Sequence, residues 1–243
     1  MRPADAGHIT IRIDDTHVVS GLLEVPRRAR ACYVLAHGAG AGMAHPFMAA
    51  VAAGLGERGI ATLRYQFPYM EQGSKRPDAP RLAHATVRAA IAEAVRLVPE
   101  LLLVAGGKSF GGRMTSQAQA IAPLVDVRGL VFLGFPLHPA KKPSNDRAQH
   151  LFDVQAPMLF LQGTRDALAD LSLLAPLVEN LGPQATLKLF AGADHSFHVV
   201  GRAAPPVAEI RGEVLNAIAA WIDQLLRDRS AHATVPHFDR PLQ

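Results

Sequence analysis

Ser109 lies in a Gly-x-Ser-x-Gly pattern, because Gly107 and Gly111 stand two residues before and after it. An apolar run, residues 101–105, precedes the pattern, and a helix-like segment follows it. When a strand, a sharp turn and a helix meet in this way, side chains at the two glycine positions would collide. The serine is then held in a strained conformation, with its hydroxyl exposed at the carboxyl edge of a sheet. The motif predicts that Ser109 is a nucleophile.

The same stretch has two other interpretations. Gly107-Lys108-Ser109 resembles the end of a phosphate-binding loop, which also lies between a strand and a helix. That loop requires a glycine five positions before its Gly-Lys pair, and this position holds Leu102, inside the apolar run. The spacing therefore argues against a phosphate site. The other interpretation is a glycine-rich turn with a solvated serine. An acid, a histidine and an oxyanion hole in the right order along the chain would argue against it.

Asp166 is the candidate acid. It follows the apolar run 158–162 within Gly163-Thr164-Arg165-Asp166. A carboxylate here can accept a hydrogen bond from the far nitrogen of an imidazole, which fixes the tautomer and stabilises the imidazolium formed during acyl transfer. The alternative is an ordinary loop or helix-capping aspartate, and that role fits Asp170 better, just before a helix predicted to begin at position 171.

His195 is the candidate general base, because it follows the last apolar run, residues 186–190. A triad in the chain order Ser, Asp, His places its histidine in this loop. The imidazole would take the proton of Ser109 and return it to the leaving group. His198 competes for the role, but His195 is favoured because it lies nearer the strand end, and position 198 would be turned away from the cleft.

A glycine-rich loop, residues 37–42, follows the first buried strand and is the candidate oxyanion hole. Its glycines let backbone N–H groups approach a ligand closely. One donor is expected from the residue after the nucleophile and one from this loop, so we assign Phe110 and Ala39. Gly40 is the alternative donor if the register of the loop differs by one. The loop could also be a turn that merely begins the next helix.

Substrate contacts are harder to assign. The segment 134–156 is too short for a large cap domain, which predicts a shallow, partly open site. Large apolar side chains near the strand ends are candidates for its lining, although each of them fits core packing equally well. The residues chosen are Gly40, Phe67, Tyr69, Phe135 and Leu137.

The elements that must position these residues read as one α/β domain. Residues 8–13 and 18–25 alternate around Asp14-Asp15 and predict an antiparallel hairpin at a sheet edge. Short apolar runs then alternate with helical patterns, which is typical of a mostly parallel sheet covered by helices on both faces. The eight expected strands are residues 8–13, 18–25, 31–36, 61–65, 101–105, 130–133, 158–162 and 186–190, and the expected helices are 46–57, 81–97, 110–121, 171–180 and 207–227.

The composition and charge indicate the domain organisation and argue against one class of partner. Hydrophobic residues make up 49% and charged residues 19%, with no linker, so residues 1–229 are expected to form a single domain. Residues 230–243 are expected to be a poorly ordered tail or a contact in a homo-oligomer. The net charge of +4 is small and scattered, which argues against nucleic-acid binding.

A metal site is not expected, since no pair of histidines and carboxylates has ligand spacing in a helix or strand setting. The single cysteine, Cys32, fits a reducing compartment. Without an apolar signal segment or a run of about 18 apolar residues, a cytoplasmic protein with no membrane span is expected.

Together these motifs resemble the α/β-hydrolase superfamily and, within it, the small dienelactone-hydrolase-like group. The resemblance extends from about residue 31 to residue 226 and implies an eight-stranded sheet, a Ser-Asp-His triad and hydrolysis without a cofactor. Dienelactone hydrolases use a cysteine nucleophile, so Ser109 argues against dienelactone itself as the substrate. The residues that carry the resemblance are 37–40, 107–114, 163–166 and 194–197.

The expected function is hydrolysis of carboxylic esters, thioesters or lactones with small to medium acyl groups, through an acyl-enzyme on Ser109. The alternative is a non-catalytic scaffold that keeps the fold. Residues 64–69 are similar to a segment common in one bacterial branch, and that branch is similar to a subunit of an animal chromatin-modifying complex.

Overall fold

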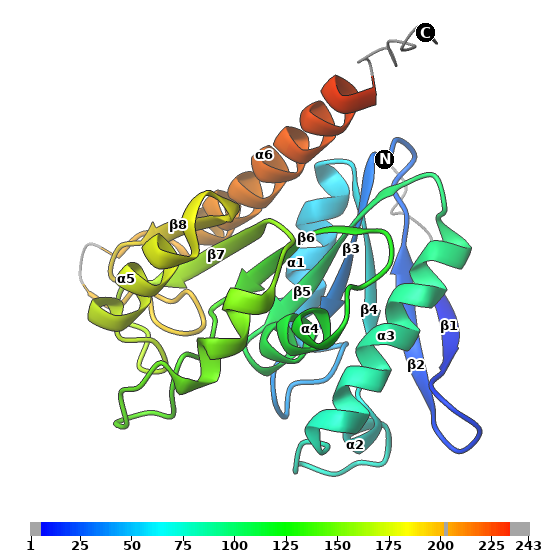
Figure 1. Ribbon diagram of the computed structural model, residues 1–243, viewed down its shortest axis with the longest axis horizontal. Coiled ribbons are helices and arrows are strands. Elements are labelled where there is room, and N and C mark those ends of the chain that lie inside the picture. The colour runs from blue at the N-terminus through cyan, green and yellow to red at the C-terminus, as the bar shows by residue number, and fades with distance from the viewer. Residues whose placement is uncertain (1–5, 202–203, 234–243) are drawn as a thin grey trace, which may run out of the picture.

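The computed structural model describes residues 6–201 and 204–233. Its centre is an eight-stranded sheet with the strand order β1-β2-β4-β3-β5-β6-β7-β8 (Figure 1). β1 and β2 form the antiparallel hairpin expected at the edge, and the strands from β4 to β8 run parallel to one another, so the predicted fold class is confirmed. The strands are β1 (Ala6–Arg12), β2 (Val18–Glu24), β3 (Ala31–Ala36), β4 (Ile60–Tyr65), β5 (Leu102–Lys108), β6 (Val127–Leu133), β7 (Met158–Gly163) and β8 (Ala185–Phe190).

Helices cover both faces of this sheet. Every residue of β3, β4, β5 and β7 is buried, as expected for parallel strands packed on both sides. One apolar core forms between the sheet and α1 and α6, and the other between the sheet and α3, α4 and α5. The helices are α1 (Pro46–Glu57), α2 (Pro68–Glu71), α3 (Pro80–Leu97), α4 (Phe110–Ile121), α5 (Leu171–Leu181) and α6 (Val207–Ala233), with short 3-10 helices η1 (Asp146–Asp153) and η2 (Gly182–Gln184).

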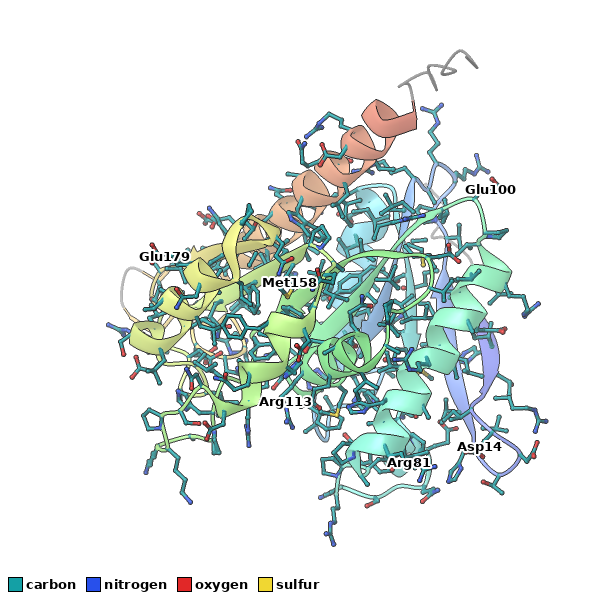
Figure 2. All side chains as sticks on the ribbon, viewed as in Figure 1. Asp14, Arg81, Glu100, Arg113, Met158 and Glu179 are labelled. Carbon is teal, nitrogen blue, oxygen red and sulfur yellow. The ribbon has the colours of Figure 1, made fainter. Side chains whose placement is uncertain are left out.

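The side chains follow this layering. Figure 2 shows Met158 in the interior, where β7 begins, and its side chain is fully buried. The labelled charged residues Asp14, Arg81, Glu100 and Glu179 lie at the periphery and are exposed. Within residues 6–201 and 204–233, no helix combines the length and the apolar character that a transmembrane helix requires.

The observed elements differ from the expected ones in a few places. The short helices α2, η1 and η2 were not predicted. β5 continues past residue 105 to Lys108, because Gly106 and Gly107 are still paired with β3 and β6. α6 continues to Ala233, beyond the expected end of the domain at 229, and the remainder of the expected tail, residues 234–243, lies outside the described residues.

Two glycines let β5 pass between its neighbours. A Cβ atom at Gly106 would lie 2.0 Å from the carbonyl oxygen of Val131, and one at Gly107 would lie 2.2 Å from that of Ala36. Both glycines also have positive φ angles, 141° and 150°, which disfavour any residue with a side chain. β5 can therefore continue to Ser109 only with glycine at positions 106 and 107.

His37 ties the ends of β3 and β4 together. Its Nε2 accepts a hydrogen bond from the backbone N–H of Phe67 at 3.1 Å, and its Nδ1 lies 2.8 Å from the carbonyl oxygen of Gly38. An imidazole that accepts at Nε2 carries its proton on Nδ1, which then donates to that carbonyl. Burial lowers the pKa of His37 to about 4, so the ring is neutral in the folded protein.

We expect Gly106→Ala to lower the free energy of unfolding by at least about 3 kcal/mol, because the added methyl group meets backbone rather than a movable side chain. Gly212→Ala is the matched control, since no heavy atom lies within 4 Å of a Cβ at this helical position. It should be neutral or stabilising by up to about 1 kcal/mol. Urea unfolding measures both, and equal effects of the two substitutions would contradict the packing described.

The protonation of His37 should make stability depend on pH. Its pKa is about 4 when folded and near the ordinary 6.5 when unfolded, so the unfolded chain binds more protons between these values. Stability should therefore fall as the pH drops from about 6.5 to 4. In His37→Asn the slope should be smaller by up to about 1.4 kcal/mol per pH unit. His8→Asn, at an exposed histidine, serves as the control, and a slope unchanged in His37→Asn would refute this prediction.

Candidate active site

Ser109 lies between β5 and α4, at the carboxyl edge of the sheet. Its backbone has φ 50° and ψ −115°, a strained conformation for a residue with a side chain. The helix that follows can begin immediately because Gly111 packs against β3: a Cβ there would lie 2.6 Å from both Ala36 Cβ and the carbonyl oxygen of His37. The sharp turn expected from the glycine pattern is therefore present.

Two hydrogen bonds connect Ser109 with the predicted acid and base. Nε2 of His195 lies 2.8 Å from Oγ of Ser109, and Nδ1 of His195 lies 2.6 Å from Oδ2 of Asp166. With Asp166 ionised, Nδ1 donates to the carboxylate, which leaves Nε2 as the acceptor for the serine proton. The side chain of Asp166 is fully buried, whereas that of His195 is 24% exposed and so remains accessible from the cleft.

The carboxylate of Asp166 is held by donors on both oxygens. The backbone N–H of Leu168 donates to Oδ1 at 2.8 Å, and the side-chain amide of Gln162 donates to Oδ2. Gln162 is itself fixed by the backbone N–H of Phe135, which donates to its Oε1 at 2.9 Å. Sequence reasoning missed Gln162, although a glutamine inside the otherwise apolar strand β7 was a visible signal.

Lys108 is the second residue whose position was not foreseen. The residue is only 9% exposed, and Nζ donates to the backbone carbonyl of His195 at 2.6 Å. The ammonium group lies inside the site, beside the loop that carries His195.

His198 lies near the site without joining the hydrogen-bonded chain. Its ring is 4.0 Å from Asp194 and its side chain is 56% exposed. Asp194 organises the loop instead, because its Oδ1 accepts from the backbone N–H groups of Ser196 and His198. Asp170 caps α5 through a hydrogen bond from the N–H of Ser172, as the sequence indicated.

The glycine-rich loop presents one backbone donor more readily than the other. The N–H of Gly40 already donates to the hydroxyl of Tyr69 at 2.9 Å. In the part of the chain that the structure describes, the N–H groups of Ala39 and Phe110 have no hydrogen-bond acceptor. This difference favours Ala39 over Gly40 as the loop's donor toward a developing oxyanion.

A cavity of about 610 Å³ opens beside Ser109 and His195. Most of its apolar lining comes from the start of α1 and from α6, and the segment 134–156 contributes none of it. The charged and titratable groups among its lining residues are Lys108, Arg211 and three histidines, with no Asp or Glu. The apolar residues include Phe47, Met48, Val51, Leu168, Phe197, Val207 and Val214.

The side chains chosen from the sequence as substrate contacts lie elsewhere. Phe67, Phe135 and Leu137 are at most 1% exposed and belong to the apolar core, and neither these nor Gly40 and Tyr69 line the cavity. Phe67 packs edge-on against His37 and Phe110, as a core residue does. Tyr69 acts through its hydroxyl, which holds Gly40. The segment 134–156 contains η1, which packs against α4, and none of its residues lines the cavity that it was expected to border.

No group of three or more His, Cys, Asp or Glu side chains among residues 6–201 and 204–233 is arranged to hold a metal ion. What the site does contain is a hydroxyl, an imidazole and a buried carboxylate in series, beside two backbone N–H groups without an acceptor. Such an arrangement can deprotonate the hydroxyl as it attacks a carbonyl carbon and can stabilise the resulting oxyanion.

Comparison with known proteins places this geometry in a family. An alpha/beta hydrolase domain model matches residues 29–223. An α/β serine hydrolase without a lid from Xanthomonas campestris is 20% identical, with a TM-score of 0.69 over 91% of this chain and 97% of its own. A dienelactone hydrolase from Anabaena variabilis is 21% identical, with a TM-score of 0.73 over 92% and 99%. Est1E from Butyrivibrio proteoclasticus is 14% identical, with a TM-score of 0.67 over 91% and 100%.

At these identities the solved structures show the shared fold, which is the α/β-hydrolase fold that the sequence motifs resemble. The family model covers most of the chain, from the start of the parallel sheet to the middle of α6. The protein therefore belongs to the alpha/beta hydrolase family.

Proposed function

We propose that this protein is a serine hydrolase that cleaves carboxylic esters or thioesters of small to medium acyl groups. The observation that carries the proposal is the pair of hydrogen bonds from Ser109 to His195 and from His195 to Asp166, at the wall of the cavity. Similarity to a serine hydrolase without a lid and to a dienelactone hydrolase supports the same reaction class.

The first half of the reaction forms an acyl-enzyme. Oγ of Ser109 attacks the carbonyl carbon while its proton passes to Nε2 of His195, and Asp166 stabilises the imidazolium. The negative charge on the former carbonyl oxygen is stabilised by the N–H groups of Ala39 and Phe110. When the tetrahedral intermediate collapses, His195 gives the proton to the leaving alcohol or thiol, and the acyl group remains on Ser109.

The second half releases the acid. A water molecule gives a proton to His195 and attacks the acyl carbon, so the same oxyanion forms again. Collapse breaks the bond to Oγ, the proton returns to Ser109, and the carboxylic acid leaves. The protein groups return to their starting protonation states, and every step uses side chains and backbone donors of this chain.

The cavity wall supports a preference for an apolar substrate part. Its lining includes Met48 and Val51 of α1 and Val207 and Val214 of α6, and none of these side chains offers a hydrogen bond. A volume of about 610 Å³ lies within the range typical of small-molecule sites, about 300–1,000 Å³. A short or medium acyl chain, or an alcohol of that size, fits such a space.

A fluorophosphonate probe tests the nucleophile. We expect it to label the wild-type protein and not Ser109→Ala. His195→Ala should abolish ester turnover, whereas the matched variant His198→Ala should keep most of it, because only His195 contacts Ser109. Asp166→Asn should lower kcat by about 10⁴-fold, since the amide no longer holds the productive tautomer.

Folded wild-type protein that no fluorophosphonate labels would refute the enzymatic proposal and favour the non-catalytic scaffold. Loss of turnover in His198→Ala with activity kept in His195→Ala would reverse the assignment of the base. Circular dichroism of each variant establishes that the comparison is between folded proteins.

The lining of the cavity should set the acyl preference. Val214→Phe adds bulk to the α6 side, so the chain length giving the highest kcat/KM in a panel of chromogenic esters should become shorter. For the longest esters, each methylene that no longer fits in the cavity should weaken transition-state binding by about 1 to 3 kcal/mol. Val125→Phe, at a 74% exposed valine, is the control and should leave the optimum unchanged. An unaltered optimum in Val214→Phe would place the acyl group outside this cavity.

A further inference from the structure

Lys108 occupies an unusual place for a lysine. It is the last residue of β5 and the covalent neighbour of Ser109, and the residue is 9% exposed. Its Nζ donates to the backbone carbonyl of His195 at 2.6 Å, a short distance typical of a charge-assisted hydrogen bond. One residue therefore connects the strand that presents the nucleophile with the loop that presents the base.

Aromatic rings and a glycine complete the surroundings of this ammonium group. Nζ lies 5.9 Å from the ring centroids of both Phe47 and Phe197, which stack on each other at 6.3 Å. Cation–π attraction at such distances favours the charged form. Gly134 closes another side, since a Cβ there would lie 3.0 Å from Nζ and 3.3 Å from the ring atoms of His195. Lysine and base thus pack against the same glycine.

We propose that Lys108 is a positioning residue, which in its charged form anchors the His195 loop so that Nε2 stays within hydrogen-bond distance of Ser109. This inference rests on the proposed hydrolase function. The imidazole is then fixed at two points: Asp166 holds the ring through Nδ1, and Lys108 holds the backbone of the same residue.

The charge on this anchor should respond to pH near neutrality. Burial lowers the pKa of Lys108 to about 8, while the carboxylates of Asp166 and Asp194 oppose this shift. Above this pH the amine is neutral, so the hydrogen bond loses its charge assistance and the cation–π attraction disappears. The titratable and charged groups that act on Lys108 or line the cavity with it are Asp166 after β7, Asp194, His195 and His198 after β8, His45 before α1, and Arg211 of α6.

The main experiment measures kcat and KM on a chromogenic ester from pH 6 to pH 10. In the wild type, kcat should fall above about pH 8. Lys108→Met should lower kcat by about 100-fold at pH 7, as a misplaced base does, while KM changes by less than about threefold. Its residual kcat should not fall further between pH 8 and pH 10.

Lys108→Arg tests rescue, because a guanidinium stays charged throughout this range. It should recover at least a tenth of the wild-type kcat, with the alkaline decrease moved beyond pH 10. Lys188→Met, at an exposed lysine of β8, is the matched control and should follow the wild type. A change in KM alone for Lys108→Met would show that the lysine binds substrate instead, and would overturn the proposal.

A second measurement keeps the proposal testable if Lys108→Met does not fold. ¹³C NMR of lysine Cε in the wild type, assigned with Lys108→Arg, should show one lysine that titrates together with the alkaline decrease in kcat. A Lys108 signal that titrates only above pH 10, or separately from kcat, would overturn the proposal.

Fluorophosphonate labelling at each pH distinguishes a failure of the proposed hydrolase function from a failure of the proposed role of Lys108. Wild-type protein that is folded but never labelled contradicts the proposed function itself. Labelling of wild type and Lys108→Met with the same rate and the same pH dependence contradicts only the role of Lys108.

Discussion

The close approach of β5 to its neighbours is the constraint on which the site depends. Gly106 and Gly107 pass within contact of Val131 and Ala36, where a single methyl group would overlap with a carbonyl oxygen. Ser109 follows directly, and its backbone has a positive φ, a conformation that costs about 1 to 3 kcal/mol. The buried strands on both sides hold the turn in place, and α4 begins directly after it. The serine is therefore presented at the end of a tightly packed glycine strand, directly before α4.

The buried carboxylate imposes a second requirement. A charge removed from water is tolerated only when donors surround it, and Asp166 receives them from Gln162, Leu168 and His195. Through Gln162 the same network reaches the backbone of Phe135, so the ends of β6 and β7 and the loop after β8 are tied to a single group. This network holds the imidazole of His195 with its Nε2 directed at Ser109.

The sequence was sufficient for the sheet and for the residues at its carboxyl edge, because parallel strands end on the same side wherever they lie in the chain. It was insufficient for the cavity wall. Met48 and Val51 repeat along α1 as core residues do, and nothing in an apolar pattern distinguishes a side chain that faces a cavity from one that faces a sheet. The expectation that Phe67 and Phe135 contact substrate was wrong for the converse reason, because large rings near a strand end also fill the core. Gln162 is visible as the one amide in the apolar strand β7, but the sequence does not show that this amide reaches the carboxylate of Asp166.

The direction of the Lys108 side chain follows from the two-residue period of β5 and not from the Gly-Lys-Ser motif. In the Gly-Lys-Ser tripeptide it invites comparison with a phosphate loop, where the lysine would reach toward a ligand beyond the strand. Side chains along a strand alternate between faces, however, so Lys108 lies on the side of Leu102 and Val104, which pack in the core formed by α1 and α6. That face also carries Phe47 and Phe197, the two rings beside Nζ. Once β5 extends to position 108, its two-residue period directs the lysine inward, and an ammonium group directed inward needs an acceptor. The carbonyl of His195 is that acceptor, so one hydrogen bond satisfies the buried ammonium group and joins the end of β5 to the loop after β8.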